Sequence, residues 1–336
     1  MAERVGRFTV KMSKKPSIIG FAASGGKKEK SGPIGDLLDK SFDDDLLGQD
    51  SWEQAESALL CNSISLALKK AELKNDQADV IFAGDLLDQS MSSTFGLKQF
   101  RIPTVGLFGA CSTMALSLSQ AALAVDSGWA NVAVAATSSH FCSAERQFRF
   151  PLEYGGRRTP NSQWTVTGSG ATVVGFESRE SAPKIDSVCI GRIADLGVTD
   201  ANNMGAAMAP AAADTIKNFL TDTGTTPDDY DLILTGDLGE IGSRLLQDLL
   251  ERDGIMLKNN YDDCGLLIFD KDSEVGAGGS GCGCSATVLC AKILPEICKG
   301  KLGRVLFVAT GALMSPKSAQ QGLSIPAVAH AVLITS

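Results

Sequence analysis

The 336-residue sequence lacks features that would each have pointed to a common class of function. Basic residues are not in excess, because 31 lysines and arginines face 39 acidic residues and leave a net charge of −8 at pH 7. A basic nucleic-acid-binding protein is therefore excluded as the first interpretation. No apolar run reaches the ~18 to 20 residues that cross a bilayer, and the basic start has no apolar segment behind it. We therefore expect a soluble protein that is not secreted.

Histidine is scarce as well, with only His140 and His330 in the chain. The nine cysteines are scattered, and the one close pair, Cys282 and Cys284, lacks the two-residue spacer and the second pair that are typical of zinc sites. An odd number of scattered cysteines argues against a disulfide framework and for a reducing compartment. The sequence therefore predicts no metal site, and nothing in it calls for a cofactor.

Glycine, by contrast, is abundant at 35 residues, and many glycines follow short apolar runs. Strands that end in tight turns and lead into helices produce this pattern, which is typical of an α/β fold. The predicted strands are 17–23, 79–84, 131–137, 171–176, 184–193, 231–236, 304–310 and 327–334. The predicted helices are 51–73, 111–125, 204–220, 243–250 and 285–298.

Two matched segments indicate an internal duplication. The stretch DVIFAGDL at 79–86 resembles DLILTGDL at 231–238, and a Cys-Ser pair opens a predicted helix at Cys111 and again at Cys284. The matches occur in the same order. We therefore expect two α/β halves, residues 1–180 and 181–336, that are related by a pseudo-twofold axis.

Residues 27–45 interrupt the first half with charge runs, glycine and proline. This composition is typical of an excursion over the surface. Two interpretations stay open for this segment, a solvated loop and a flap that contacts a partner.

Cys111 is the strongest candidate for a reactive or ligand-binding residue. It follows the apolar segment 104–110 and begins an alanine-rich helix, so its sulfur is expected at a strand–turn–helix junction. The partial positive charge and the free N–H groups of a helix N-terminus lower the pKa of a thiol and also suit an anionic ligand. From these residues alone, a small buried cysteine that closes a tight turn is an equal alternative.

The sequence GACSTMAL at 109–116 resembles the thiolase superfamily. The resemblance to ketoacyl-synthase-III-like members continues through VAATSSH at 134–140, GSGATVVG at 168–175 and the glycine-rich turn before Ser285, and so covers nearly the whole chain. It implies the five-layered αβαβα thiolase fold and a homodimer. It also implies an acyl-accepting role for Cys111.

Two departures from the thiolase pattern argue against catalysis. The condensing enzymes use a histidine after the strand that corresponds to 231–236 and an asparagine in the later glycine-rich turn, whereas this sequence has TGDLG at 235–239 and GAGGSG at 276–281. Each of the missing groups normally contributes roughly 10²- to 10⁴-fold to the rate. Cys282 or Cys284 could stand in for the second cysteine of thiolases, but the histidine would still be missing. We therefore expect no condensing activity.

Three further motifs support a narrower resemblance. RFPLEYGG at 149–156, QWTVTG at 163–168 and DANNMGAAMAP at 200–210 are similar to the stage V sporulation protein AD family of endospore-forming bacteria. The resemblance implies a cytoplasmic protein peripherally associated with the spore inner membrane. It further implies that the protein binds dipicolinic acid (pyridine-2,6-dicarboxylate), free or as the calcium chelate, for transport into the developing spore together with other stage V sporulation A membrane proteins.

A planar dicarboxylate needs a slot that offers N–H donors. We expect such donors at the helix start formed by Cys111 and Ser112, at the turn containing Gly168 and at the turn containing Gly279. His140 either donates a hydrogen bond to a carboxylate or is a satisfied buried histidine.

Asp85 and Asp237 follow the matched strands of the two halves. They become favourable contacts if the ligand is the calcium chelate, because calcium takes oxygen ligands. Their alternative role is a helix cap or turn. Arg157 and Arg158 either pair with a carboxylate of the ligand or are solvated.

The main hypothesis from the sequence is a non-catalytic, thiolase-fold protein that binds dipicolinate. A divergent acyltransferase with Cys111 as acyl acceptor is the first alternative, and a scaffold for membrane partners with a vestigial pocket is the second. An acidic protein is not attracted to anionic lipid, so placement at a membrane would depend on protein partners.

Overall fold

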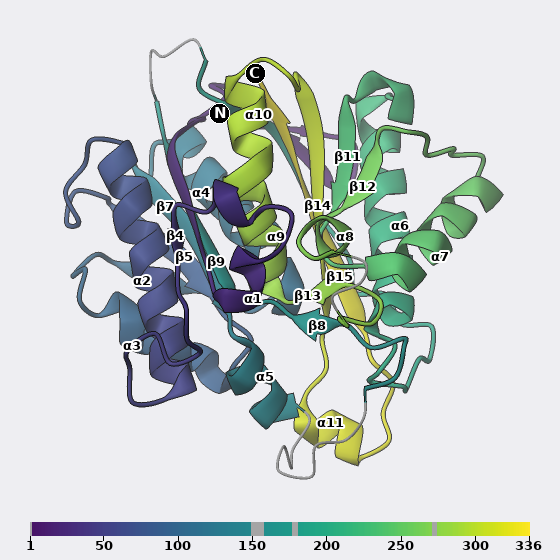
Figure 1. Ribbon diagram of the computed structural model, residues 1–336. Coiled ribbons are helices and arrows are strands. Elements are labelled where there is room, and N and C mark those ends of the chain that lie inside the picture. Colours follow the sequence, from purple (N-terminus) through teal and green to yellow (C-terminus); the bar gives the residue numbers. More distant parts are fainter. Residues whose placement is uncertain (1, 149–157, 177–180, 271–273) are drawn as a thin grey trace.

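The computed structural model describes residues 2–148, 158–176, 181–270 and 274–336. In this part of the chain the strands form one mixed sheet of 13 strands and a separate two-stranded pair (Figure 1). The main path of the sheet has the order β12 (Tyr261–Asp263), β11 (Leu232–Thr235), β14 (Arg304–Ala312), β15 (Ala327–Thr335), β10 (Lys184–Ile190), β3 (Ser17–Gly25), β9 (Gly168–Gly175), β7 (Ala133–Ser139), β5 (Val80–Gly84) and β6 (Thr104–Gly106). Short strands β1 (Glu3–Val5), β2 (Thr9–Lys11) and β4 (Lys40–Ser41) attach to this path, and β8 (Trp164–Thr165) pairs with β13 (Gly279–Ser280).

The two ends of this path repeat one topology. From the centre outward, the first half runs β3, β9, β7, β5, β6 and the second half runs β10, β15, β14, β11, β12. In both halves the two outermost pairings are parallel and the pairings nearer the centre are antiparallel. The matched segments at 79–86 and 231–238 supply β5 and β11. The predicted fold of two pseudo-twofold-related α/β halves is therefore confirmed.

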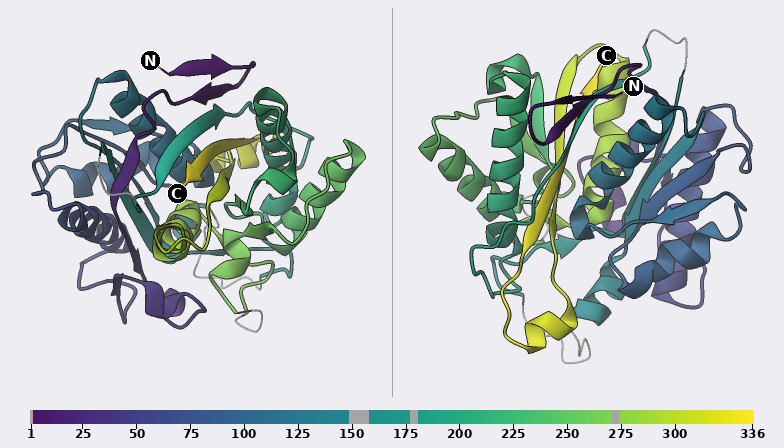
Figure 2. Two further views of the ribbon diagram at one scale, coloured as in Figure 1. Left: turned by 90° about the horizontal axis from the view of Figure 1, so that it is seen from above. Right: turned by 180° about the vertical axis from the view of Figure 1, so that it is seen from behind.

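Helices separate and cover the two half-sheets (Figures 1 and 2). Between them lie α4 (Thr113–Ser127) and the continuous helix made of α9 (Cys282–Val288), a π turn (Leu289–Ile293) and α10 (Leu294–Cys298). Helices α2 (Trp52–Lys70) and α3 (Met91–Leu97) pack outside the first half, and α6 (Met204–Thr223) and α7 (Gly239–Arg252) outside the second. This is the five-layered arrangement of helix, sheet, helix, sheet and helix that the sequence predicts.

The central helix α4 is buried on nearly every side because it contacts strands of both half-sheets. Its large side chains, Met114 and Leu118, are fully buried, and each such side chain contributes roughly 1.5–3 kcal/mol to stability. The serines between them hydrogen-bond within the helix, as Ser119 Oγ does to the Ala115 carbonyl at 2.7 Å. Small residues and satisfied hydroxyls thus let α4 lie in the centre without unpaired polar groups.

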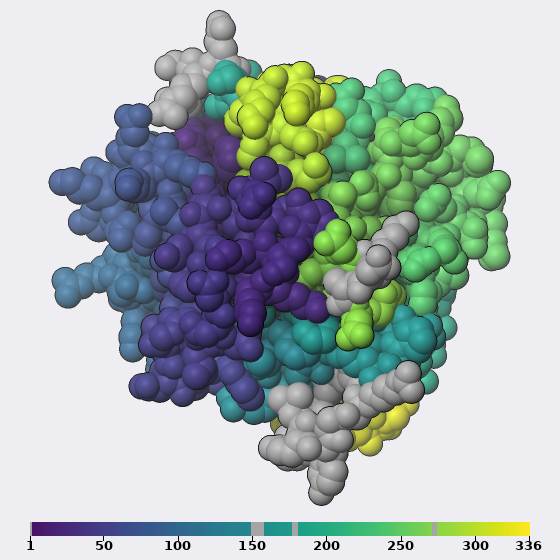
Figure 3. All heavy atoms as spheres, viewed as in Figure 1, coloured from purple at the N-terminus to yellow at the C-terminus, as the bar shows by residue number. Residues whose placement is uncertain are grey.

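The excursion at 27–45 is partly built into the first half. It contains α1 (Lys27–Lys30) and β4, which pairs with β3, and it lies on the front surface of the molecule in Figure 3. Glu29 is buried, and its Oε1 accepts a hydrogen bond from the Thr167 backbone N–H at 3.0 Å. The interpretation as a solvated loop is therefore wrong for the part around Glu29.

The sequence located the main elements but not all of their limits. Helix α4 begins at Thr113, after a 3₁₀ turn at Ala110–Ser112, and α9 begins at Cys282, before the expected start at Ser285. Helices α5 (Phe141–Phe148), α8 (Cys264–Leu267) and α11 (Pro316–Gln320) are short elements that the periodicity did not predict. The proposed boundary between residues 180 and 181 stays a prediction, because 177–180 lie outside the described residues.

Candidate functional site

A small cavity of about 90 Å³ lies beside Cys111, where the two halves meet. The first half contributes Cys111 from the turn before α4 and Glu145 and Phe148 from α5. The second half contributes Ser280 from β13 and Ala312 from β14. The fold thus places the predicted candidate Cys111 in the wall of a cavity that neither half could form alone.

A tight turn fixes the position of Cys111. Ala110 has a φ of +48°, which is uncommon for a residue with a side chain. Gly311 of β14 packs against this turn so closely that a Cβ on it would lie 2.2 Å from the Gly109 carbonyl oxygen. Ser112 Oγ donates to that same carbonyl at 2.6 Å. The Ser112 hydroxyl therefore holds the turn, and Ser112 is not among the residues that line the cavity.

Asp237 is the buried partner of Cys111 and comes from the other half. Its carboxylate oxygens accept hydrogen bonds from the Gly281 N–H at 2.8 Å, from Thr310 Oγ1 at 2.8 Å and from Ser280 Oγ at 3.3 Å. The Cys111 thiol is an electrostatic neighbour of the same carboxyl group, and each of the two groups shifts the pKa of the other. Burial raises the pKa of Asp237 to about 7, against an ordinary value of 3.8.

The electrostatics of this pair correct one expectation from the sequence. We expected the helix start to lower the pKa of the Cys111 thiol. The pKa is instead raised well above its ordinary value, first by burial and then by the neighbouring Asp237 carboxyl. Near neutral pH Cys111 is therefore a protonated thiol and a weak nucleophile.

Asp85 lies away from the cavity lining. Its two oxygens accept from the Leu87 N–H at 2.8 Å and the Ser93 N–H at 2.7 Å. Asp85 is thus a buried residue that fixes the turn after β5, which was the alternative role for it. The equivalent sequence positions of Asp85 and Asp237 do not produce equivalent surroundings.

His140 and Gly168 also lie outside the cavity lining. The His140 Nε2 hydrogen-bonds to the Asp45 carbonyl at 2.7 Å, and Nδ1 accepts from the Cys142 N–H at 3.1 Å, so both ring nitrogens are occupied. Burial lowers the pKa of His140 and keeps the ring neutral. At Gly168 a Cβ would lie 2.5 Å from Thr287 Oγ1, so this glycine permits close packing of β9 against α9.

The segment before β8 supplies cavity residues that the sequence did not single out. Gln163 lines the cavity, and its Nε2 donates to the carbonyls of Asp237 at 2.7 Å and Gly279 at 3.0 Å. Gly279 thus contacts Gln163 through its carbonyl oxygen, and it is not among the residues that line the cavity. Gln163 lies in the motif QWTVTG, which was a signal for the family but carried no chemical role.

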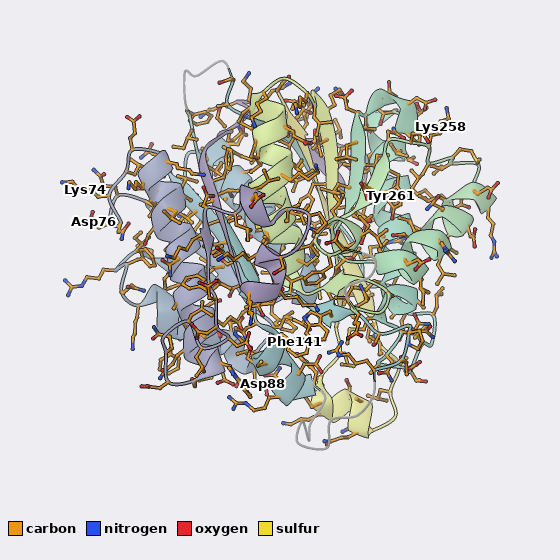
Figure 4. The ribbon with its side chains drawn as sticks, in the orientation of Figure 1. Lys74, Asp76, Asp88, Phe141, Lys258 and Tyr261 are labelled. Atoms are coloured by element: carbon orange, nitrogen blue, oxygen red, sulfur yellow. The ribbon has the colours of Figure 1, made fainter. Side chains whose placement is uncertain are left out.

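Arg158 contacts two of the residues that line the cavity, Gln163 and Glu145. Its guanidinium pairs with Glu145, donates to the Gln163 carbonyl at 2.6 Å, and lies 5.0 Å from the Phe141 ring and 4.9 Å from the Trp164 ring. These two rings stack with centroids 3.9 Å apart, and Phe141 is labelled in Figure 4. Arg158 is therefore a packed, paired residue. Arg157 and the motif at 149–156 lie outside the described residues.

Within residues 2–148, 158–176, 181–270 and 274–336, histidine, cysteine and acidic side chains form no group of three or more that could hold a metal ion. In the same ranges no helix combines the length and the apolar character that a bilayer span requires.

Comparison with solved structures places the fold among the thiolase-like proteins. The 3-oxoacyl-[acyl-carrier-protein] synthase III of Aquifex aeolicus superposes with a TM-score of 0.58, over 96% of this chain and 100% of that chain, at 15% sequence identity. Cerulenin-bound OleA of Xanthomonas campestris superposes with a TM-score of 0.61, over 96% and 97% of the two chains, also at 15% identity. At these identities the likeness establishes the fold alone.

Sequence comparison then identifies the family. The family model of stage V sporulation protein AD matches residues 6–335. The stage V sporulation protein AD of Bacillus subtilis (strain 168) is 48% identical over 308 residues, which cover 92% of this chain and 90% of that protein. The chain therefore belongs to the stage V sporulation protein AD family, and the resemblance seen in the sequence is confirmed.

The contact between Asp237 and Cys111 makes a testable prediction about thiol reactivity. Substitution of Asp237→Asn removes the negative charge beside the sulfur and keeps the size of the side chain. We expect the pH at which Cys111 is half-maximally alkylated by iodoacetamide to fall, because the thiolate loses a repulsive neighbour. The rate is measured by mass spectrometry of the Cys111 peptide. Cys61, a buried cysteine on α2, serves as an internal control whose profile stays unchanged. An unchanged Cys111 profile would contradict the assignment.

Proposed function

We propose that the protein binds dipicolinic acid, free or as its calcium chelate, in the cavity beside Cys111, without catalysis, for uptake into the developing spore. The observation that carries the proposal is a cavity between the two thiolase-like halves whose candidate nucleophile is held as a neutral thiol. Membership in a family of sporulation proteins supports the same assignment.

The size and lining of the cavity suit a small planar ligand. Its volume of about 90 Å³ is well below the ~300 Å³ at which pockets for drug-sized ligands begin. Phe108, Phe148 and Met314 offer apolar surface for an aromatic ring, and Gln163 and Asn202 offer polar atoms at its edge. Such a combination of apolar walls and a few polar groups supports binding of a pyridine ring with carboxylate arms.

The charges around the cavity favour the calcium chelate over the free dianion. Glu145 is in the lining and Asp237 lies directly behind Cys111. These carboxyls would repel a free dicarboxylate, even though Arg158 pairs with Glu145. Calcium cancels the charge of the ligand and accepts oxygen ligands. We therefore expect the chelate to bind more tightly.

The absence of catalysis is proposed from the chemistry of Cys111. A thiol must ionise to accept an acyl group efficiently, and both burial and Asp237 oppose its ionisation. The structure brings Asp237 and the glycine-rich turn at 279–281 to the thiol. Neither supplies a histidine base or an asparagine donor. The location of Cys111 in a cavity wall nevertheless supports one second candidate function, a divergent acyltransferase.

A direct test is calorimetric titration with dipicolinate, with and without one equivalent of calcium, beside picolinate, which lacks the second carboxylate. We expect saturable binding that is tightest for the calcium chelate and at least about tenfold weaker for picolinate. The variant Ala144→Leu fills the cavity from α5 and should weaken binding by about tenfold or more while leaving the protein folded. Lys74→Ala, at the left edge of the molecule in Figure 4 and away from the labelled Phe141, is the control. A folded wild-type protein that gives no binding heat in any arm would overturn the proposal.

We further propose that the protein is a homodimer that works with stage V sporulation A membrane proteins at the spore inner membrane. Strand β6 ends the order of the main sheet, so one of its edges has no strand partner among the described residues. Val105 on this strand is 37% exposed. Phe108, two residues beyond the end of the strand at Gly106, is 53% exposed and also lines the cavity. Pairing of two β6 edges would bury this apolar surface.

The dimer proposal is tested by sedimentation equilibrium. We expect the wild-type protein to have twice the mass of one chain and Val105→Lys to shift the equilibrium to the monomer, because the substitution puts a charge into the proposed interface. Leu323→Lys changes an equally apolar residue that is 55% exposed elsewhere on the surface, and should leave the mass unchanged. A monomeric wild type, or a Val105→Lys protein that remains dimeric, would refute the β6 interface.

A further inference from the structure

Asp237 is a buried carboxyl group that lies one side chain behind the wall of the cavity. It is 0% exposed and is not among the residues that line the cavity. Two of its neighbours do line it. Ser280 Oγ donates to Asp237 Oδ2 at 3.3 Å, and the Cys111 thiol is near enough for the carboxyl to raise its pKa. A single layer of side chains therefore separates Asp237 from a ligand in the cavity, and the charge of the carboxylate acts through that layer.

No cation balances the Asp237 carboxylate in the part of the chain that the structure describes. Asp237 forms no salt bridge there with lysine, arginine or histidine, and its donors, the Gly281 N–H and the hydroxyls of Thr310 and Ser280, are uncharged. The titratable groups on the elements packed around it are thiols and one further carboxyl: Cys111 before α4, Asp263 and Cys264 where β12 meets α8, and Cys282 and Cys284 on α9. When ionised, Asp237 therefore carries an uncompensated negative charge.

This environment keeps Asp237 near the balance between its two protonation states. Burial disfavours the charged form and the hydrogen bonds favour it, so that the pKa of Asp237 lies at about 7. A further negative charge placed nearby shifts the balance toward the protonated form. Glu145 is a carboxyl in the cavity lining itself, but it is paired with Arg158. Asp237 is thus the carboxyl beside the cavity that most readily accepts a proton.

We propose that the cavity takes up a proton together with a free dicarboxylate, and that Asp237 is the group that holds this proton. The inference rests on the proposed function, because it assumes that dipicolinate binds beside Cys111. The proton comes from solvent and adds to one carboxylate oxygen of Asp237, and no other bond changes. In the calcium chelate the metal already cancels the charge of the ligand, so this form binds without a proton. Calcium and the proton are therefore alternative ways to bring the same ring into the cavity.

The coupling determines how the affinity changes with pH. Below about pH 6, Asp237 is protonated before the ligand binds, and the affinity for the free dianion is independent of pH. Above about pH 7 the empty site is ionised, and each bound dianion brings a proton with it. The affinity for the free dianion then falls as the pH rises, by up to about tenfold per pH unit, because ligand and proton binding are linked. The affinity for the chelate should stay constant over the same range.

The test is calorimetric titration of the full chain at about pH 7.5, with free dipicolinate in a calcium chelator and with preformed calcium dipicolinate. Each titration is made in two buffers, one of small and one of large ionisation enthalpy, because the change in observed enthalpy between them gives the number of protons taken up. We expect roughly 0.5 to 0.8 proton per free dianion, which follows from a pKa of about 7 that rises by one unit or more on binding. For the chelate we expect a proton number near zero.

Asp237→Asn removes the titratable group and keeps its size. We expect this variant to take up less than about 0.1 proton per free dianion and to lose the pH dependence of affinity. A purely structural role of Asp237 would weaken both forms of the ligand equally and leave the proton number unchanged. Asp126→Asn is the matched control and should keep the wild-type proton number. Asp126 is also a buried aspartate, but it lies near the far end of α4, roughly 20 Å along the helix from Cys111.

The outcomes separate this inference from the function on which it rests. The inference is refuted, and the proposed function stands, if wild-type protein binds the free dianion without a proton, takes up the same number with the chelate, or binds the chelate alone at every pH from about 6 to 8.5. An unchanged proton number in Asp237→Asn, or its loss in Glu145→Gln instead, refutes the role of Asp237. If neither form of the ligand binds, the proposed function fails. Should Asp237→Asn not fold, the wild-type proton numbers and pH profile decide.

Discussion

The Cys111 thiol of the first half and the Asp237 carboxyl of the second half are electrostatic neighbours at the point where the two central helices begin. The turn before α4 presents the thiol, and the segment after β11 presents the carboxyl. Gly281 and Thr310 hold the carboxyl in place with two hydrogen bonds of 2.8 Å. The position of the cavity, the protonation of its thiol and the orientation of Gln163, which bonds to the Asp237 carbonyl, all depend on this junction.

The junction shows how one fold supports different chemistry. A thiol at the start of a helix is suited to catalysis when it is solvated or has a base beside it. Here burial and a carboxyl neighbour act in the opposite direction and keep the proton on sulfur. The thiolase-like fold is retained, while the electrostatics of the site oppose ionisation of the thiol.

The sequence predicted the features that local patterns determine and missed those that depend on distant neighbours. Strand–turn–helix spacing and the matched segments at β5 and β11 were enough to predict the duplicated fold and to place Cys111 at a helix start. They could not show that the His140 ring forms a hydrogen bond through Nε2 with the Asp45 carbonyl, which is 95 residues away in the sequence. Gln163 was missed because its place in the site depends on contacts with the Asp237 and Gly279 carbonyls, and only the packed structure shows which hydrogen bonds are made.

We propose that Cys111 is part of the wall of a binding cavity and does not act as a nucleophile. Incubation of the protein with acyl-CoA at neutral pH, followed by mass spectrometry of the Cys111 peptide, tests it most directly. We expect no acyl adduct on Cys111 under conditions in which the calcium chelate of dipicolinate saturates the site. Stoichiometric acylation of Cys111 would contradict it and would support the acyltransferase instead.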